Sequence, residues 1–404
     1  MKILVLNCGS SSVKFLLYEM EEEVKLAKGL VERIGSEGAA FRFTNFDKKF
    51  EGPLGGDNDH DAAIVKVIDF LIEEKIIKNA DEIEGVGHRV VHGGEAYKDS
   101  VIIDEAVVKT VRDLIPLAPL HNPANLDGIE GAVKLLPNAK QVAVFDTAFH
   151  QTMPADAYLY AIPYEYYEEQ KVRRYGFHGT SHSFISQRMA EIGGKGIEGT
   201  RIISVHLGNG CSICAVQSGK SVDTSMGLTP LEGLVMGTRS GDLDPGLVTS
   251  LVKQGIMSSD PKADNYSDKI LNKKSGLLGL YGKSNDMREI QEAMEAGEER
   301  ARLAFAVTAR RLKKYIAAYA AVMGGVDYLV FTAGIGENSV IMRAAATEGL
   351  GFMGLELDPE KNRAVSGETC ISTDGSPSQI WVIPTKEELY IARDTKKVLL
   401  GLGD

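Results

Sequence analysis

The sequence KILVLNCGSSSVKFLL, residues 2–17, carries the clearest structural pattern in the chain. An apolar run at residues 3–6 precedes a Gly-Ser turn at residues 8–12, and a second apolar run follows at residues 13–17. Two strands joined by such a turn predict a β-hairpin. A similar unit recurs at residues 201–216 with the turn Gly208-Asn209-Gly210. Two such hairpins about half a chain apart indicate a duplicated domain.

Strands and helices alternate through the rest of the chain. The hydrophobic patterns predict helices at residues 62–77, 181–192 and 301–323, and strands at residues 85–92, 141–145 and 328–331. Residues 260–282 carry the weakest pattern, and we expect a loop there. This alternation favours an α/β fold with two related domains around a central cleft.

The composition of the 404 residues excludes several classes of protein. Hydrophobic residues at 44% and charged residues at 25% exclude a fibre, a disordered chain and a disulfide scaffold. A net charge of −11 repels nucleic acid and anionic lipid. Four cysteines suit a reducing cytosol, and the first apolar run is too short for a signal peptide. We therefore expect a cytoplasmic protein that binds neither nucleic acid nor a membrane.

Three Gly-rich turns follow apolar strands, at residues 8–12, 208–210 and 334–338. Such turns offer backbone N–H groups to anions. Any one of them is more simply a plain turn, but three in one chain favour a nucleotide site. The chain has no Walker A sequence, and Gly334-Ile335-Gly336 lacks the third glycine of a dinucleotide fingerprint.

The strand at residues 85–92 carries a cation. Alternation places Gly87, Arg89 and Val91 on one face, and His88 on the other face is more simply a buried core histidine. Arg89 beside Val91 suits a short amphiphilic anion. An ion pair between Arg89 and a structural carboxylate is equally compatible with the pattern.

Two further segments carry candidate phosphate ligands. Thr180 or Ser181 can cap the helix that follows, which puts His178 at the positive end of that helix. Arg239 lies in a loop between Gly237 and Gly241, which is either a surface turn or a mobile phosphate clamp.

Two short motifs have simpler structural explanations. Thr385 and Glu388 fit a capping box, which leaves Glu387 to hold a hydrated Mg²⁺ or simply to complement the helix dipole. Cys211 and Cys214 are three apart in a predicted strand and point to opposite faces, so we expect neither a redox pair nor a zinc site.

Together the motifs resemble those of the acetate, propionate and butyrate kinase family. Residues 3–14, ILVLNCGSSSVK, and residues 203–212, ISVHLGNGCS, are similar to its two long signatures. Shorter matches lie in the same order at residues 88–94, 177–182, 237–241, 334–338 and 385–388. The resemblance implies duplicated ribonuclease-H-like domains around a cleft, as in actin, sugar kinases and heat-shock ATPases. Residues 1–149 with 385–404 would form the N-terminal domain with a returning helix, and residues 150–384 the C-terminal domain with the nucleotide site.

The resemblance to acetate kinases implies reversible, Mg²⁺-dependent, in-line transfer of the γ-phosphoryl group of ATP to acetate, giving acetyl phosphate and ADP, by a homodimer; Mn²⁺ could replace Mg²⁺. Arg89 and Arg239 would bind acetate and the phosphoryl group, His178 would stabilise the transition state, and Asp146 would be an essential carboxylate. Mg²⁺ would be served by Asn7 and Glu387. The acetate methyl pocket would comprise Val91, Leu120, Phe177 and Pro230. The ATP site would comprise Lys14, His206, Leu207, Gly208, Asn209, Gly210, Asp286, Met287, Arg288, Gly334, Ile335, Gly336, Glu337 and Asn338.

The chemistry of the acceptor narrows the role of Asp146. A carboxylate with an ordinary pKa of roughly 4–5 is ionised at neutral pH and needs no general base. We therefore expect Asp146 to orient Mg²⁺ or an active-site arginine rather than to transfer a proton. Two alternatives stay open at this point. One is a propionate kinase of the same family, and the other is a nucleotide-binding protein without acyl phosphate chemistry.

Overall fold

The computed structural model of the chain describes residues 1–46, 48–119 and 121–402. Contacts divide the chain into two compact units. The first unit comprises Met1–Gln151 with Lys386–Asp404, and the second comprises Thr152–Thr385. Each unit is described by itself.

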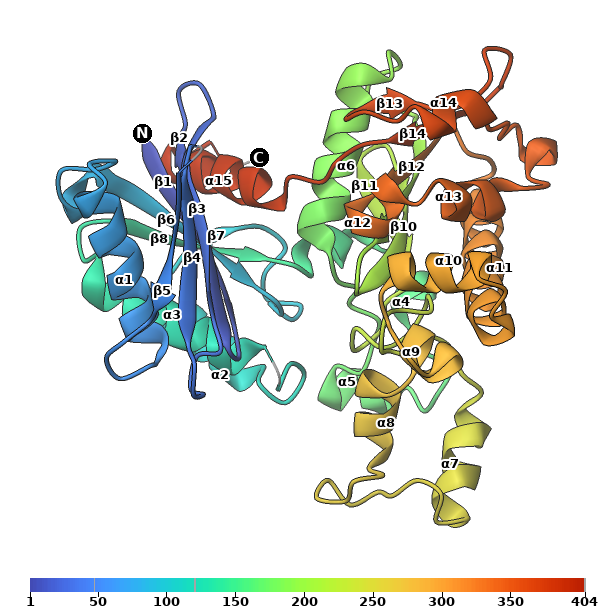
Figure 1. Ribbon diagram of the computed structural model, residues 1–404, viewed down its shortest axis with the longest axis horizontal. Coiled ribbons are helices and arrows are strands. Elements are labelled where there is room, and N and C mark those ends of the chain that lie inside the picture. The colour runs from blue at the N-terminus through green and yellow to red at the C-terminus, as the bar shows by residue number, and fades with distance from the viewer. Residues whose placement is uncertain (47, 120, 403–404) are drawn as a thin grey trace. The chain divides into compact units, whose positions relative to one another are not determined.

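A mixed sheet forms the centre of the first unit, with the strand order β5-β4-β3-β2-β1-β6-β8-β7 (Figure 1). The predicted hairpin is confirmed: β1 (Lys2–Gly9) and β2 (Ser12–Glu19) pair antiparallel, with Gly9 opposite Ser12. β1 pairs in parallel with β6 (Ile83–Val90), which pairs in parallel with β8 (Lys140–Phe145). The remaining strands are β3 (Val24–Glu32), β4 (Ala40–Asn45), β5 (Lys48–Pro53) and β7 (Val101–Ile102).

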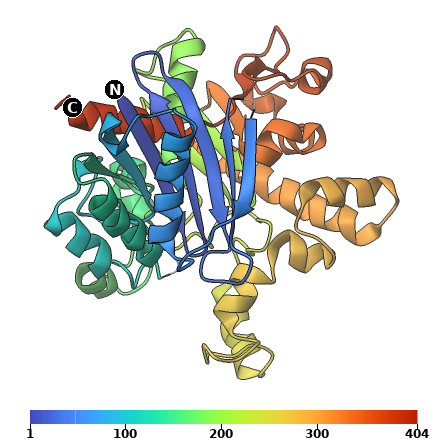
Figure 2. The ribbon, with the colours of Figure 1, turned by 60° about the vertical axis from the view of Figure 1, so that its left-hand side comes forward.

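Helices cover both faces of this sheet because β1 alternates two apolar sets. Leu4 and Leu6 pack in a core that includes Ile64 of α1 (His60–Glu73), and Ile3 and Val5 pack in a core that includes Ile391. Ile391 belongs to the C-terminal helix α15 (Glu387–Leu399), which Figure 2 shows on the face of the sheet away from α1. The other helical segments are η1 (Ala80–Glu82), α2 (Glu105–Asp113), α3 (Asn122–Leu135) and η2 (Ala148–Thr152).

Two glycines of β6 set the distance between the sheet and α15. A Cβ added at Gly85 would lie 2.6 Å from Leu399 Cδ1, and one at Gly87 would lie 2.3 Å from Thr395 Oγ1. At Gly87 a side chain would meet Thr395 and Ile391 of the helix, whereas at Gly85 the contact is with the flexible end of Leu399, so Gly87 is the position that most requires glycine. Arg89 follows on the same face, where the helix begins.

The second unit repeats the topology of the first. Its sheet has the order β11-β10-β9-β12-β14-β13 (Figure 1). The second predicted hairpin is confirmed: β9 (Arg201–Leu207) pairs antiparallel with β10 (Cys211–Gln217), and β9 pairs in parallel with β12 (Tyr328–Thr332). The other strands are β11 (Lys220–Thr224), β13 (Thr369–Cys370) and β14 (Gln379–Val382). A hairpin whose first strand pairs in parallel with a later strand is common to both units, which confirms the duplicated α/β fold.

Two predictions made from the sequence need correction in the second unit: the N-cap of one helix and a loop. The helix expected from Ser181 is α6 (Gly179–Ile192), and the residue at its N-cap is His178, with φ of 57° and no side-chain cap. The loop expected at residues 260–282 is wrong, because α8 (Ser267–Lys273) and α9 (Gly276–Tyr281) lie there. Tertiary contacts override the weak local pattern: Leu277 and Tyr281 are buried, and the Thr238 hydroxyl donates to the Asn272 carbonyl at 2.9 Å.

The long predicted helix is confirmed as α11 (Glu299–Val322), which ends before Gly324. In the part of the chain that the structure describes, no helix has the length and apolar character to cross a membrane. The remaining helical segments of this unit are α4 (Ala155–Tyr158), α5 (Glu165–Gln170), α7 (Pro245–Lys253), α10 (Met287–Glu295), α12 (Ala333–Asn338), α13 (Val340–Thr347), η3 (Gly351–Met353) and α14 (Pro359–Arg363).

Candidate active site

Arg89 and Asp146 form an ion pair at the carboxyl edge of the first sheet. Asp146 directly follows β8, and its N–H donates to the Val90 carbonyl at 2.9 Å, which fixes the turn. Arg89 Nη2 donates to Asp146 Oδ2 at 2.8 Å. The Asp146 side chain is only 1% exposed. Arg89 is thus paired with a structural carboxylate, one of the two possibilities that the strand pattern left open.

The Arg89 guanidinium keeps a donor for a ligand. Burial by itself would lower the pKa of Arg89, but Asp146 and Glu387 outweigh it and raise that pKa, so the group stays charged. Its Nε atom is buried, has no hydrogen-bond partner among the described residues, and lies 4.0 Å from Glu387 Oε2. An unsatisfied buried donor marks a place where an acceptor from a ligand would gain a hydrogen bond.

The predicted capping box of α15 is wrong. The residue at the N-cap is Lys386, without a side-chain cap. The Thr385 hydroxyl lies 3.0 Å from Ser181 Oγ, and Glu388 forms an ion pair with Lys14 of β2. Both side chains of the predicted capping box therefore have partners from distant parts of the sequence.

The donors at this edge fit a hydrated Mg²⁺ rather than a protein-enclosed metal. Among the described residues, no cluster of three or more His, Cys, Asp or Glu side chains could hold a metal ion. Asn7 follows Leu6 in β1, which pairs with His88, so Asn7 neighbours Arg89 at the end of the sheet. An amide oxygen from Asn7 and the Glu387 carboxylate match the way Mg²⁺ usually binds, with few protein ligands, several waters and substrate phosphates.

In the second unit, His178 and Arg239 meet at the turn of the β9–β10 hairpin. The His178 ring stacks on the His206 ring at 4.2 Å, and its Nδ1 lies 2.9 Å from Ser212 Oγ. A Cβ added at Gly210 would lie 3.4 Å from His178 Cε1 and 3.5 Å from Arg239 Nη1. The structure thus brings together three groups that the sequence analysis singled out separately.

Arg239 is a cation for which the part of the chain that the structure describes supplies no counter-ion. Its Nη1 donates to the Pro230 carbonyl at 3.2 Å, and among the described residues no carboxylate contributes to its pKa. Burial lowers the pKa of Arg239, and the Cys211 thiol opposes this only in part. A buried charge without a partner is costly, so an anionic ligand here would be stabilised.

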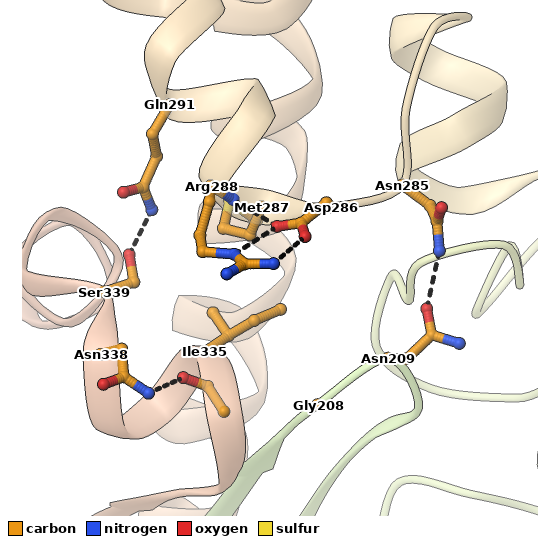
Figure 3. Close-up of a pocket in the computed structure, with 11 residues that line it drawn as sticks. Gly208, Asn209, Asn285, Asp286, Met287, Arg288, Gln291, Ile335, Asn338 and Ser339 are labelled. Atoms are coloured by element: carbon orange, nitrogen blue, oxygen red, sulfur yellow. Dashed lines mark hydrogen bonds and ion pairs between the residues drawn. The ribbon is translucent and has the colours of Figure 1, made fainter. Parts of the chain in front are cut away.

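A pocket of about 730 Å³ opens beside this turn, which is a typical volume for a small-ligand site (Figure 3). Asp286 begins α10 by accepting the Arg288 N–H at 2.8 Å, and it also holds the Arg288 guanidinium at 2.6 Å. Asn285 Nδ2 donates to Asn209 Oδ1 at 2.9 Å, which ties the loop before α10 to the turn. The lining residues are Gly208, Asn209, Asn285, Asp286, Met287, Arg288, Gln291, Gly334, Ile335, Asn338 and Ser339.

Three of these lining residues were missed in the sequence. Asn285 adjoins the matched residue Asp286. Gln291 follows Met287 by four residues and shares its helix face, and its amide donates to Ser339 Oγ at the start of α13. Helical spacing would have found Gln291, and adjacency would have found the other two.

Several predicted nucleotide ligands lie outside the pocket lining. Lys14 is on β2 of the first unit. His206 Nδ1 lies 2.8 Å from Ser181 Oγ, and Leu207 lines a small apolar cavity. Gly210 adjoins His178 and Arg239, as described above. The carbonyls of Gly336 and Glu337 each accept from Arg343 at 2.9 Å.

The predicted methyl pocket is distributed over both units. Val91 is buried after β6, where its N–H donates to Asn125 Oδ1 at 2.9 Å. Phe177 is buried and Pro230 is half-buried in the second unit. Leu120 lies outside the described residues.

The two cysteines of the C-x-x-C sequence lie in β10 as buried thiols that form no disulfide bond among the described residues. Burial raises the pKa of Cys211 to about 12 and moves the pKa of Cys214 in the same direction. They therefore act as core side chains and not as a redox pair.

Comparisons with known proteins agree over the whole chain. Residues 2–393 match the Acetokinase family. An acetate kinase of Thermotoga maritima is 54% identical over 410 residues and one of Dictyoglomus thermophilum is 52% identical over 404 residues, with at least 99% of each chain covered. A crystal structure of Porphyromonas gingivalis acetate kinase superposes with a TM-score of 0.93 at 48% identity, covering 98% of this chain and 99% of that one. A propionate kinase from Francisella tularensis superposes with a TM-score of 0.91 at 42% identity and the same coverage. The chain therefore belongs to the acetokinase family, a family of phosphotransferases with a carboxyl group as acceptor.

Proposed function

We propose that this chain transfers the γ-phosphoryl group of ATP to acetate, reversibly, forming acetyl phosphate and ADP. The observation that carries the proposal is Arg239, a guanidinium that has no counter-ion among the described residues and lies beside His178 and the turn at residues 208–210. A protein that only binds a nucleotide would gain little from placing the hydrogen-bond donors of Arg239 and His178 beside the same turn. The full-length similarity to proteins named acetate kinase supports acetate as the acceptor.

The nucleotide would bind in the pocket of the second unit. Its volume and its polar lining suit a nucleotide, and Asp286 holds Arg288 at its rim. The nucleotide ligands that we carry over from the family are Lys14, His206, Leu207, Gly208, Asn209, Gly210, Asp286, Met287, Arg288, Gly334, Ile335, Gly336, Glu337 and Asn338.

The proposed reaction requires the active-site residues to stabilise charge and does not require them to transfer a proton. The acetate carboxylate is the nucleophile, and it is ionised at neutral pH. We assign Arg89 and Arg239 to binding the acetate and the phosphoryl group, and His178 to donating a hydrogen bond to an equatorial oxygen during in-line transfer. Val91, Leu120, Phe177 and Pro230 would surround the acetate methyl group.

Asp146 acts on Arg89 in this scheme. Its carboxylate is buried and accepts from the guanidinium at 2.8 Å, so it orients that side chain. Because acetate is already ionised and needs no general base, Asp146 is expected to orient either Mg²⁺ or an active-site arginine. The ion pair with Arg89 supports the second role.

Asn7 and Glu387 would hold Mg²⁺ through water at the edge of the first sheet. The ion, when bound, neutralises charge on the ATP phosphates. An assay of ADP formation against Mg²⁺ concentration, with Mn²⁺ in parallel, tests this assignment. Glu387→Gln should raise the concentration of Mg²⁺ needed for half the maximal rate.

The function is tested by trapping acyl phosphate with hydroxylamine in the presence of ATP and Mg²⁺. Wild-type protein should form hydroxamate only when acetate is added, and Arg239→Ala should lose this activity. Arg188→Ala is the matched control, because Arg188 pairs with Glu368 and Glu191 on the surface of α6. Nucleotide binding without hydroxamate from any acid would refute the proposal.

The same assay with propionate and butyrate decides the substrate. One extra methylene costs only about 1–3 kcal/mol in a hydrophobic pocket, so propionate should react more slowly than acetate without being excluded. Val91→Ala should raise the activity on propionate relative to acetate. An unchanged ratio would show that Val91 does not face the methyl group, and a wild-type preference for propionate would make the chain a propionate kinase.

We also propose a homodimer, as the family resemblance implies. Light scattering distinguishes a particle of 43.7 kDa from one of twice that mass. A monomer at assay concentration that retains full activity would contradict the proposal.

A further inference from the structure

A cluster of alternating histidine and serine side chains lies behind His178 in the second unit. His178 and His182 are four residues apart at the start of α6 and share one helix face. Ser204 and His206 are two apart on β9, and Ser212 of β10 pairs directly with His206. Helical and strand periodicity thus place all five side chains together.

Ser212 connects the two histidines of α6. Its Oγ lies 2.9 Å from His178 Nδ1 and 2.7 Å from His182 Nε2. His182 Nδ1 lies 2.9 Å from Ser204 Oγ. The side chains of His182, Ser204 and Ser212 are all completely buried. The two hydrogen bonds of His182 are therefore shielded from water, whereas the bond between His178 and Ser212 is partly buried.

The hydroxyl of Ser212 couples the proton positions of the two rings. It has one hydrogen, so it can donate to only one of the two rings, and when it does the other ring donates to it. In one arrangement Ser204 donates to His182, His182 donates to Ser212, and Ser212 donates to Nδ1 of His178. The proton of a neutral His178 is then on Nε2. In the reverse arrangement, Nδ1 of His178 carries the proton and Nε2 does not.

The surroundings of His178 favour its neutral form, and the proposed role of that form requires the first arrangement. The ring stacks on that of His206, and the Arg239 guanidinium lies near the same turn, at Gly210. A second positive charge here would be repelled, so a neutral imidazole is favoured. A neutral His178 can donate to a phosphoryl oxygen only from the nitrogen that Ser212 does not engage.

We propose that Ser212 and His182 are positioning residues that hold His178 in the Nε2–H tautomer, as the donor for the transferred phosphoryl group. The inference rests on the proposed function of His178. Under this proposal, two buried residues determine which nitrogen of His178 donates the hydrogen bond. Neither of them would contact the substrate. Ser204 closes the network at its far end.

The test is the tautomer of His178, read by ¹⁵N NMR of ligand-free protein labelled at its eight histidines. Long-range ¹H–¹⁵N spectra distinguish the two tautomers, and a His178→Gln sample assigns the signal. Wild-type His178 should show the Nε2–H form at pH 7.5. In Ser212→Ala both tautomers should appear, and kcat should fall roughly two- to twelvefold, the range that one hydrogen bond supplies. The KM values for ATP and acetate should stay unchanged.

Ser186→Ala is the matched control. Ser186 is a buried serine of the same helix, and its hydroxyl donates to the Ser183 carbonyl at 2.9 Å. This variant should keep both the wild-type tautomer and the wild-type kcat. A general effect of deleting a buried hydroxyl from this region would lower kcat in both variants and would refute a specific role for Ser212.

Wild-type protein alone can overturn the proposal, whether or not Ser212→Ala folds. An Nδ1–H tautomer or a doubly protonated His178 at pH 7.5 would exclude it, as would an unchanged tautomer and kcat in Ser212→Ala. Failure of the proposed function shows separately, as a lack of hydroxamate from wild-type protein, since the tautomer measurement needs neither substrate nor turnover.

Discussion

The ion pair between Asp146 and Arg89 has one buried and one partly exposed member, with side chains 1% and 18% exposed. Removing one member of a buried pair leaves an uncompensated charge, whereas the intact pair contributes little to stability. The value of this pair therefore lies in geometry. Asp146 holds the Nη2 end of the Arg89 guanidinium and leaves the Nε atom available to a ligand.

Replacing Asp146 with Asn should lower kcat about 100-fold. The Arg89 guanidinium would lose its orientation, and displacement of an active-site group by about 1 Å costs about that factor in rate. The Mg²⁺ concentration for half-maximal rate should not change. Steady-state kinetics over a Mg²⁺ series measures both. Asp61→Asn is the control, because it breaks an exposed pair with Lys134 at 2.9 Å and should leave kcat unchanged. Recovery of the Asp146→Asn rate at high Mg²⁺ would instead assign Asp146 to the metal.

At the scale of elements, the contact between β6 and α15 decides where Glu387 lies. The helix approaches the sheet over Gly85 and Gly87, and its first turn then meets the Arg89 guanidinium at 4.0 Å. The position of a proposed metal ligand is thus set by two residues that carry no side chain.

Gly87→Ala should move α15 away from the sheet. The added Cβ would lie 2.3 Å from Thr395 Oγ1 and 2.8 Å from Ile391 Cγ2. Overpacking of this kind costs about 1–3 kcal/mol of unfolding free energy, which urea titration measures. The half-saturating Mg²⁺ concentration should rise as Glu387 is displaced. Gly375→Ala, where a Cβ has nothing within 4 Å, should alter neither quantity.

Local patterns predicted those elements whose partners are close in sequence. Both hairpins and α11 depend on neighbouring residues, and the structure confirms them. The capping box failed because Glu388 pairs with Lys14, which is 374 residues away in the chain. Helices α8 and α9 were missed because tertiary contacts of Leu277 and Tyr281, and not helix propensity, hold that segment.

In the candidate site, too, the sequence indicated some residues, whereas contacts between distant segments could not be predicted. The resemblance to a family supplied Gly208, Asp286 and Asn338, which the structure places in one pocket. No periodicity in the sequence indicated that Arg239 would meet His178 at Gly210, because a segment of 60 residues separates the two in the chain. The hydrogen-bond network through Ser212 was equally invisible, although its residues follow helical and strand spacing.

At the scale of the whole molecule, each unit has its own sheet and its own buried histidines. His88 and His92 belong to the first unit and are 3% and 0% exposed. Burial lowers the pKa of His88 to about 4, which its hydrogen bond to Gln141 opposes only in part, and burial lowers the pKa of His92 to about 4 as well. The only tryptophan, Trp381, is in β14 of the second unit. Its emission therefore follows the second unit, while circular dichroism follows both.

The first unit should lose stability as the pH falls from about 6.5 to 4. The unfolded chain binds protons at its histidines near pH 6.5, whereas the folded unit binds them only near pH 4, so the stabilisation is complete above 6.5 and declines below it. At pH 5 each histidine should cost about 2 kcal/mol relative to pH 7.5. Urea unfolding followed by circular dichroism at both pH values measures the sum. His88→Gln keeps a donor for Gln141 but cannot titrate, so it should remove about 2 kcal/mol of the pH dependence. Equal losses in wild type and His88→Gln, or a loss confined to the Trp381 signal, would place the acid sensitivity elsewhere.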